Sequence, residues 1–151
     1  MININQNAPV KCQKKIIINA HTVEVWKVLT DINKWTHWQS DIKLARMNGP
    51  LKEGTTFEWT SGGLKIRSTI QAVQPYSIFG WTGKALGLYA IHNWHIIELN
   101  SQTEVTVEES MEGFLAGLFK KMLNKNLDKS LGRWLDLLKT ECEKSTYVKP
   151  K

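Results

Sequence analysis

The stretch LYAIHNWHIIELNSQTEVTVEES, residues 88–110, decides the fold. Apolar and polar side chains alternate along much of it, and Asn100-Ser101-Gln102 interrupts the alternation near the middle. Two alternating segments joined by a short polar turn are typical of an antiparallel hairpin. In the second segment Val105 and Val107 share a face with Glu109, and we expect this face to point into the core.

The register of this hairpin determines what surrounds its histidines. A two-residue turn at Ser101-Gln102 would pair Trp94 with Glu109, and two residues further His92 with Met111. Both His92 and Trp94 would then lie on the inner face, whereas a slip of one residue would turn them outward. The sequence therefore predicts an inner face that carries an imidazole and a carboxylate among apolar groups.

His92-x-x-His95 would suit a metal ion only in a helix, because residues i and i+3 lie on opposite faces of a strand. No third ligand stands at a suitable spacing, and Cys12 and Cys142 form no CxxC pair. The chain also lacks a phosphate-binding loop and a nucleophile elbow. We expect no metal site and no cofactor, with His95 pointing outward.

The rest of the chain alternates short segments with turns. A strand is expected at 14–19, a helix at 21–32 and a second, brief helix at 33–39. Turn signals then separate strands expected at about 42–48, 55–60, 64–74, 77–83, 88–99 and 103–112. These connections are too short for crossover helices, so the sheet should be antiparallel. After Gly113 an apolar stripe at helical spacing predicts one long helix from Phe114 to about Cys142.

This order predicts an α+β fold in one domain, residues 1–151, with its core at about 10–143 and flexible tails at both ends. A curved, seven-stranded antiparallel sheet would wrap around the C-terminal helix, with two short helices after the first strand. Since a curved sheet cannot meet a straight helix along its whole length, we expect a cavity between them with its mouth at one end.

The composition is typical of a soluble globular protein, with 42% hydrophobic and 23% charged residues and a formal charge of +6. The N-terminus, MININQNAPVKCQKK, lacks the apolar segment of a signal peptide. No apolar run approaches the roughly 20 residues that cross a bilayer. We expect a cytoplasmic protein. Seven tryptophans indicate either a broad aromatic core or an aromatic-lined cavity.

Two segments carry a family resemblance: VWKVLTDINKWTHWQSDIKLARMNGPLKEGTTFEW (25–59) and GWTGKALGLYAIHNWHIIELNSQTEVTVEES (80–110). They resemble the polyketide cyclase/dehydrase-like branch of the START-like (SRPBCC) superfamily, whose helix-grip fold is shared with the birch pollen allergen group. The likeness runs from about residue 14 to 142. The matching features are Val25-Trp26, Asp31, Trp35, Trp38, Gly49-Pro50, Gly54-x-x-Phe57-x-Trp59, Gly80-Trp81, His92-x-Trp94 and Thr106-x-x-Glu109.

The resemblance implies a hydrophobic cavity that binds a lipid, sterol, polyketide or other flat apolar molecule. We expect the wall to come from inward strand positions and from the long helix, namely Phe57, Trp59, Ile66, Ser68, Ile70, Phe79, Trp81, His92, Trp94, Val107, Glu109, Leu118 and Met122. Plain core filling would explain the same aromatic residues. The tryptophans on the expected helices are assigned to core or lid packing: Trp26, Trp35, Trp38 and Trp134.

An inward carboxylate at Glu109 is costly unless it is paired or hydrated. Three interpretations stay open. Glu109 accepts hydrogen bonds from Trp94 or His92 in a buried structural network. Alternatively, Glu109 and His92 form the polar end of a ligand cavity, or the two perform general acid–base chemistry.

Three classes of function follow. We favour a protein that binds a hydrophobic small molecule. The alternatives are a cyclase/dehydratase-type enzyme that uses Glu109 and His92 for proton transfer, and a protein-binding adaptor resembling the chaperone-activator branch. The resemblance implies that the family's cyclases place additional polar and charged groups in the cavity, whereas the inward positions assigned here are mostly apolar and Arg67 is expected to face outward. This departure favours binding over catalysis.

The last expected helix is basic. It carries Lys120, Lys121, Lys125, Lys129, Arg133 and Lys139 against Asp128 and Asp136. We interpret this face as solvated helix surface, with peripheral docking to an anionic membrane as the alternative. No recognised nucleic-acid-binding module is present, so no nucleic-acid partner is expected.

Overall fold

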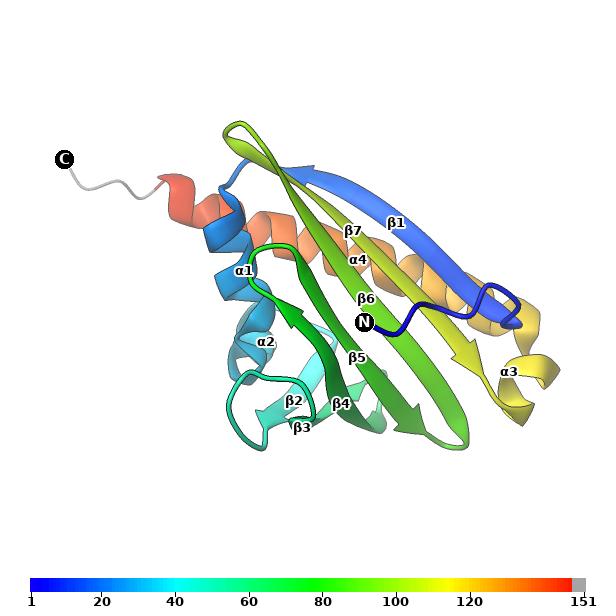
Figure 1. Cartoon of the computed structure of the whole chain (residues 1–151). Helices are drawn as coiled ribbons and strands as arrows, with labels where there is room; N and C mark the ends of the chain where they lie inside the picture. Colours follow the sequence, from blue (N-terminus) through cyan, green and yellow to red (C-terminus); the bar gives the residue numbers. More distant parts are fainter. Residues whose placement is uncertain (148–151) are drawn as a thin grey trace.

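The computed structural model describes residues 1–147 and forms one curved sheet wrapped around a long helix (Figure 1). The elements are β1 (Val10–Ile18), α1 (Thr22–Thr30), the 3-10 helix η1 (Ile32–Lys34), α2 (Trp35–Trp38), β2 (Ile42–Met47), β3 (Thr56–Ser61), β4 (Leu64–Gln74), β5 (Ile78–Ala85), β6 (Leu88–Leu99), β7 (Gln102–Glu112), α3 (Phe114–Leu118) and α4 (Lys120–Tyr147). Seven strands pair antiparallel in the order β1-β7-β6-β5-β4-β3-β2. The expected α+β helix-grip architecture is therefore confirmed.

The β6–β7 hairpin has the expected faces but a different register. Its turn is Asn100-Ser101, because Leu99 pairs with Gln102, and Asn100 adopts a φ of 57°. Asparagine tolerates this left-handed conformation, which two-residue hairpin turns need. The expected turn at Ser101-Gln102 is therefore wrong, and every pair moves by two residues. A shift of two preserves the side of each residue, so His92 stays inside and pairs directly with Glu109.

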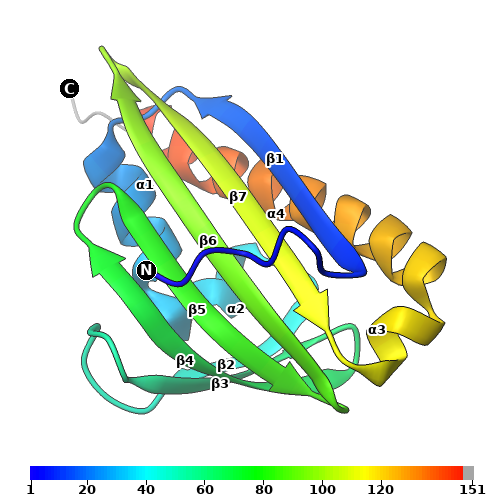
Figure 2. The same ribbon diagram turned by 45° about the vertical axis from the view of Figure 1, so that its right-hand side comes forward.

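The expected single C-terminal helix is broken near its start. α3 ends at Leu118, Phe119 has a φ of −106° and a ψ of 28°, and α4 begins at Lys120 at an angle to α3 (Figure 2). The break changes the phase of the apolar stripe, so Leu118 and Met122 lie exposed instead of facing the sheet. The buried stripe of α4 starts further on, at Leu127, Leu131, Trp134, Leu135, Leu138 and Cys142.

The C-terminal tail expected after about residue 143 lies only partly within the described residues. α4 continues to Tyr147, and residues 148–151 fall outside them. Within residues 1–147, no helix is both long enough and apolar enough to span a membrane.

The concave face of the sheet changes character along its strands. On β5 the inward side chains shrink from Phe79 and Trp81 to Gly83 and Ala85. Where the side chains are large, they meet α2 and the C-terminal half of α4 in a close-packed aromatic core. Trp35 is its centre, with T-shaped or tilted ring contacts at 5.1–5.8 Å to Phe57, Trp59, Trp81 and Trp134.

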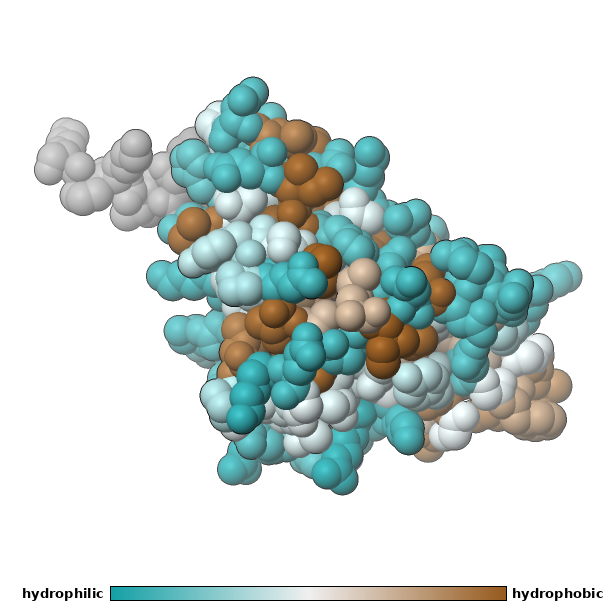
Figure 3. Space-filling model, in the orientation of Figure 1, coloured by the Kyte–Doolittle hydropathy of each residue, from teal (hydrophilic) through white to brown (hydrophobic). Residues whose placement is uncertain are grey.

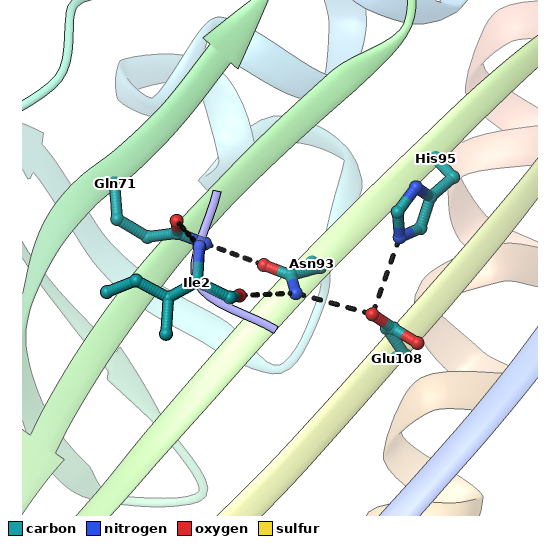
Figure 4. Close-up of polar contacts among 5 residues, drawn as sticks. All are labelled: Ile2, Gln71, Asn93, His95 and Glu108. Atoms are coloured by element: carbon teal, nitrogen blue, oxygen red, sulfur yellow. Dashed lines mark hydrogen bonds and ion pairs between the residues drawn. The ribbon is translucent and has the colours of Figure 1, made fainter. Parts of the chain in front are cut away.

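The N-terminal residues lie across the convex face of the sheet (Figures 1 and 2). The Ile2 amide donates to Gln71 Oε1 at 2.5 Å, and its carbonyl accepts from Asn93 Nδ2 at 3.0 Å. Asn93 is fully buried and contacts Gln71 at 2.7 Å and Glu108 at 3.3 Å, and Glu108 lies 3.4 Å from His95 (Figure 4). The expectation that His95 faces away from the core is confirmed.

Gly80 on β5 leaves the space in which Gln71 and Asn93 meet. A Cβ at this position would lie 2.5 Å from Gln71 Nε2 and 2.7 Å from Asn93 Oδ1. We expect Gly80→Ala to separate these amides and to lower the free energy of unfolding by about 1–3 kcal/mol, as overpacking usually does. Urea denaturation checks this. Gly117→Ala is the control, since nothing lies within 4 Å of its Cβ and alanine favours a helix. Equal stability of the Gly80 variant and wild type would contradict this role.

Candidate functional site

A cavity of about 770 Å³ lies between the concave face of the sheet and the N-terminal half of α4. It occupies the half of the sheet where inward side chains are small, notably Gly83 and Ala85 on β5 and Ala90 on β6. Its wall consists of Ser40, Asp41, Lys43, Trp59, Ser61, Gly62, Gly63, Leu64, Ile66, Ser68, Trp81, Gly83, Ala85, Leu88, Ala90, His92, Glu109, Met111, Leu123, Asn126, Leu127, Lys129, Ser130, Arg133 and Trp134. The volume falls in the range of roughly 300–1,000 Å³ typical of small-molecule sites.

The structure brings together only part of the predicted wall. Six predicted residues line the cavity: Trp59, Ile66, Ser68, Trp81, His92 and Glu109. Five others are buried in the core away from it: Phe57, Ile70, Phe79, Trp94 and Val107. Leu118 and Met122 do not line it, because the break at Phe119 turns them to solvent.

The helix side of the cavity comes from residues that sequence reasoning missed. Leu123, Leu127 and Trp134 face it from α4, although Trp134 was assigned to core or lid packing. Trp134 also contacts Trp35 and Trp94 at 5.1 and 5.9 Å, so it separates the filled half of the interior from the hollow half. The spacing of 123, 127 and 134 along one helix face is a signal that could have identified them.

One row of cross-strand neighbours brings a histidine and a carboxylate together on the concave face. Cys12, Glu109, His92, Trp81 and Ile70 are successive cross-strand neighbours on β1, β7, β6, β5 and β4. His92 Nδ1 lies 2.5 Å from Glu109 Oε2, and the imidazole stacks on Trp81 at 4.2 Å with 9° between the rings. His92 is 4% exposed and Glu109 9%, so the pair is largely desolvated.

The pair is incompletely satisfied. His92 Nδ1 faces the Glu109 carboxylate, so Nε2 is the ring nitrogen that points away from it. Within the described residues neither His92 Nε2 nor Trp94 Nε1 has a hydrogen-bond partner. The indole of Trp94 therefore does not donate a hydrogen bond to Glu109. A buried polar atom without a partner costs about 1–3 kcal/mol. The contact between His92 and Glu109 agrees with the buried-network interpretation, and the unpartnered His92 Nε2 keeps the ligand interpretation open beside it.

The rim of the cavity is charged, and polar contacts connect the elements that form it. Arg133 on α4 donates to Asp41 Oδ2 at 2.8 Å and to Ser40 Oγ at 2.7 Å. On the other side, the β3–β4 hairpin turns at Gly62-Gly63, whose φ angles of 56° and 82° suit glycine. Arg133 therefore connects the loop after α2 to α4 on one side of the rim. The exposed β3–β4 hairpin forms the other side.

The thiols are not activated. Burial, and then the negative charge of Asp128, raises the pKa of Cys12, and burial raises the pKa of Cys142 to about 12. Asp128 also accepts from Lys14 at 2.9 Å, and this hydrogen bond lowers the pKa of Asp128 and raises that of Lys14. Neither cysteine is thus a thiolate nucleophile near neutral pH.

Known proteins confirm the architecture. The solved structures most similar in fold include a hypothetical protein from Helicobacter pylori, at a TM-score of 0.81 and 19% identity over 94% of this chain and 97% of that one. The Zhui aromatase/cyclase from Streptomyces sp. R1128 matches at 0.80 and 13% identity, over 90% and 94% of the two chains. A START superfamily protein from Mycobacterium smegmatis matches at 0.77 and 14% identity, over 89% and 97%.

At these identities the structures show the fold alone. No functionally curated protein matches the chain in sequence. A family described as polyketide cyclase/dehydrase and lipid transport matches residues 9–143, nearly the whole chain. The chain therefore belongs to the polyketide cyclase/dehydrase and lipid transport family.

Proposed function

We propose that the protein binds a hydrophobic small molecule, of the lipid, sterol, polyketide or flat aromatic class, in the cavity beneath α4. The observation that carries this proposal is the cavity itself, about 770 Å³ in volume, whose wall surface is mainly apolar. His92 and Glu109 form a buried polar pair in this wall, as in sites that orient a ligand through one hydroxyl or carbonyl. Membership of the family supports the same class of ligand.

A fluorescent apolar probe tests the proposal. Trp59, Trp81 and Trp134 line the cavity, so a bound anilinonaphthalene sulfonate molecule should quench their emission and emit by energy transfer. We expect one saturable site per chain and competition by fatty acids, sterols or aromatic polyketides. An interior that takes up no probe, with tryptophan emission unchanged throughout the titration, would overturn the proposal.

A second candidate function is proton-transfer catalysis of the cyclase or dehydratase type. The observation in its favour is the desolvated His92–Glu109 pair, whose imidazole keeps one nitrogen free. A histidine held by a carboxylate in one tautomer is a common general base. Arg67 is exposed on the outer face, as expected. Its position does not argue against catalysis, because other charged residues line the cavity, namely Asp41, Lys43, Lys129 and Arg133.

Glu109→Gln separates the two candidates. If the protein is a binder, we expect the affinity for the apolar probe to change by less than about threefold, since the amide oxygen can still accept from His92. If it is an enzyme, turnover of candidate aldol or dehydration substrates should fall by about 10²-fold or more. Glu108→Gln is the matched control, because Glu108 faces His95 on the convex side. Unchanged turnover in Glu109→Gln would eliminate the catalytic candidate.

A further inference from the structure

One end of the molecule exposes an apolar tip, which we define as Leu86, Phe114, Leu118, Phe119 and Met122. Phe114 is 82% exposed and Leu86 69%, and the other three exceed 40%. The β5–β6 turn and the start of α3 lie against each other here, since Gly113 packs on the Gly87 carbonyl with no room for a Cβ. In Figure 3 apolar colours gather over α3 at the lower right.

The tip has no structural explanation within the fold. Of the residues in α3 only Ala116 is buried, so the large side chains on this short helix contribute little to the core. Single exposed apolar residues are ordinary, but a contiguous cluster marks a surface that meets an apolar partner.

Charge indicates the kind of partner. From Gly113 to Leu127 the sequence contains three lysines and no acidic residue. Lys120, Lys121 and Lys125 are exposed beside the tip, and the exposed Lys84 precedes the β5–β6 turn. Exposed aromatic and aliphatic side chains with lysines beside them are typical of a surface that inserts into an anionic bilayer.

We infer that the apolar tip docks the protein peripherally on anionic membranes. This refines the expectation from the sequence, which placed the contact on the basic face of the C-terminal helix. Two cations of that face are engaged within the protein, Arg133 with Asp41 and Lys139 with Glu143 at 3.2 Å. The tip also adjoins cavity residues Leu88, Met111 and Leu123, so docking would bring the cavity beside the lipid.

Vesicle sedimentation tests the inference, with vesicles of phosphatidylcholine alone or containing phosphatidylglycerol. We expect wild type to bind the anionic vesicles, and less so at high salt. The triple variant Phe114→Ser, Leu118→Ser and Phe119→Ser should bind at least about tenfold more weakly. The double variant Lys120→Glu and Lys121→Glu should bind the anionic vesicles more weakly by a similar factor.

Matched controls separate the tip from general surface effects. Val23→Ser with Ile97→Ser removes two other exposed apolar side chains, and Lys52→Glu with Lys65→Glu makes the same change in net charge elsewhere. Both should bind like wild type, and circular dichroism should show all variants folded.

Absence of wild-type binding, or equal loss in the controls, would overturn the inference. A dimeric wild type that binds no vesicles, together with a monomeric triple variant, would also overturn the inference. A second copy of the chain would then cover the tip. Probe binding in vesicle-free solution is a separate readout, so failure here and failure of the proposed ligand site are distinguishable.

Discussion

Replacing Trp35 by alanine is expected to remove about 3–5 kcal/mol from the free energy of unfolding. Trp35 is fully buried and contacts four aromatic rings from β3, β5 and α4. Its indole Nε1 also donates to the Leu29 carbonyl at 2.9 Å, which fixes α1 relative to α2. Since domains are stable by only about 5–15 kcal/mol, this one substitution should remove a large share of the total.

Urea denaturation measures the loss, and the melting temperature should fall by on the order of 10 °C. Trp35→Phe should lower the free energy of unfolding by less, because it keeps an aromatic ring in the cluster. It still loses the hydrogen bond to the Leu29 carbonyl. Phe114→Ala is the matched control, an exposed aromatic whose removal should alter stability by under about 0.5 kcal/mol. A cost below about 1 kcal/mol for Trp35→Ala would show that the aromatic cluster does not hold the helices to the sheet.

Replacing Ala90 by phenylalanine is expected to reduce the affinity for an apolar probe at least tenfold, which corresponds to about 1.4 kcal/mol or more. Ala90 lies on β6 and contributes to the cavity wall, so the new ring would project into space that a ligand needs. Because the ring fills open volume rather than close-packed core, the fold should tolerate it.

Fluorescence titration measures this effect beside Ile97→Phe, which places the same residue on the convex face of the same strand. That control should bind like wild type. The comparison also addresses the adaptor alternative, because a protein that acts through its exterior would be indifferent to Ala90→Phe. Equal probe affinity in both variants would place the binding site outside the cavity.

The sequence predicted the sheet well because alternation along a strand is a local signal. The sides of His92, Trp94 and Glu109 were correct although the register was wrong by two residues, since side depends only on parity. The exact turn depended on the left-handed conformation of Asn100, one of several polar residues that could have supplied it.

The C-terminal helix and the cavity were harder to predict, for physical reasons. Continuous apolar spacing concealed the break at Phe119, so Leu118 and Met122 were placed inside. Aromatic residues were taken to be the walls, but close packing buries most of them completely and leaves the hollow where side chains are small. Gly83 and Ala90 were the relevant signal, and only the fold shows that they face the same space.

Native mass spectrometry of the protein purified from its own cells tests the central claim most directly. We predict a complex heavier than the bare chain by one small molecule, which organic extraction releases and identifies as apolar. The Ala90→Phe variant, expressed in the same cells, should lack this mass, whereas Ile97→Phe should retain it. Bare protein alone for wild type, together with no uptake of apolar probes or lipid extracts, would contradict the account.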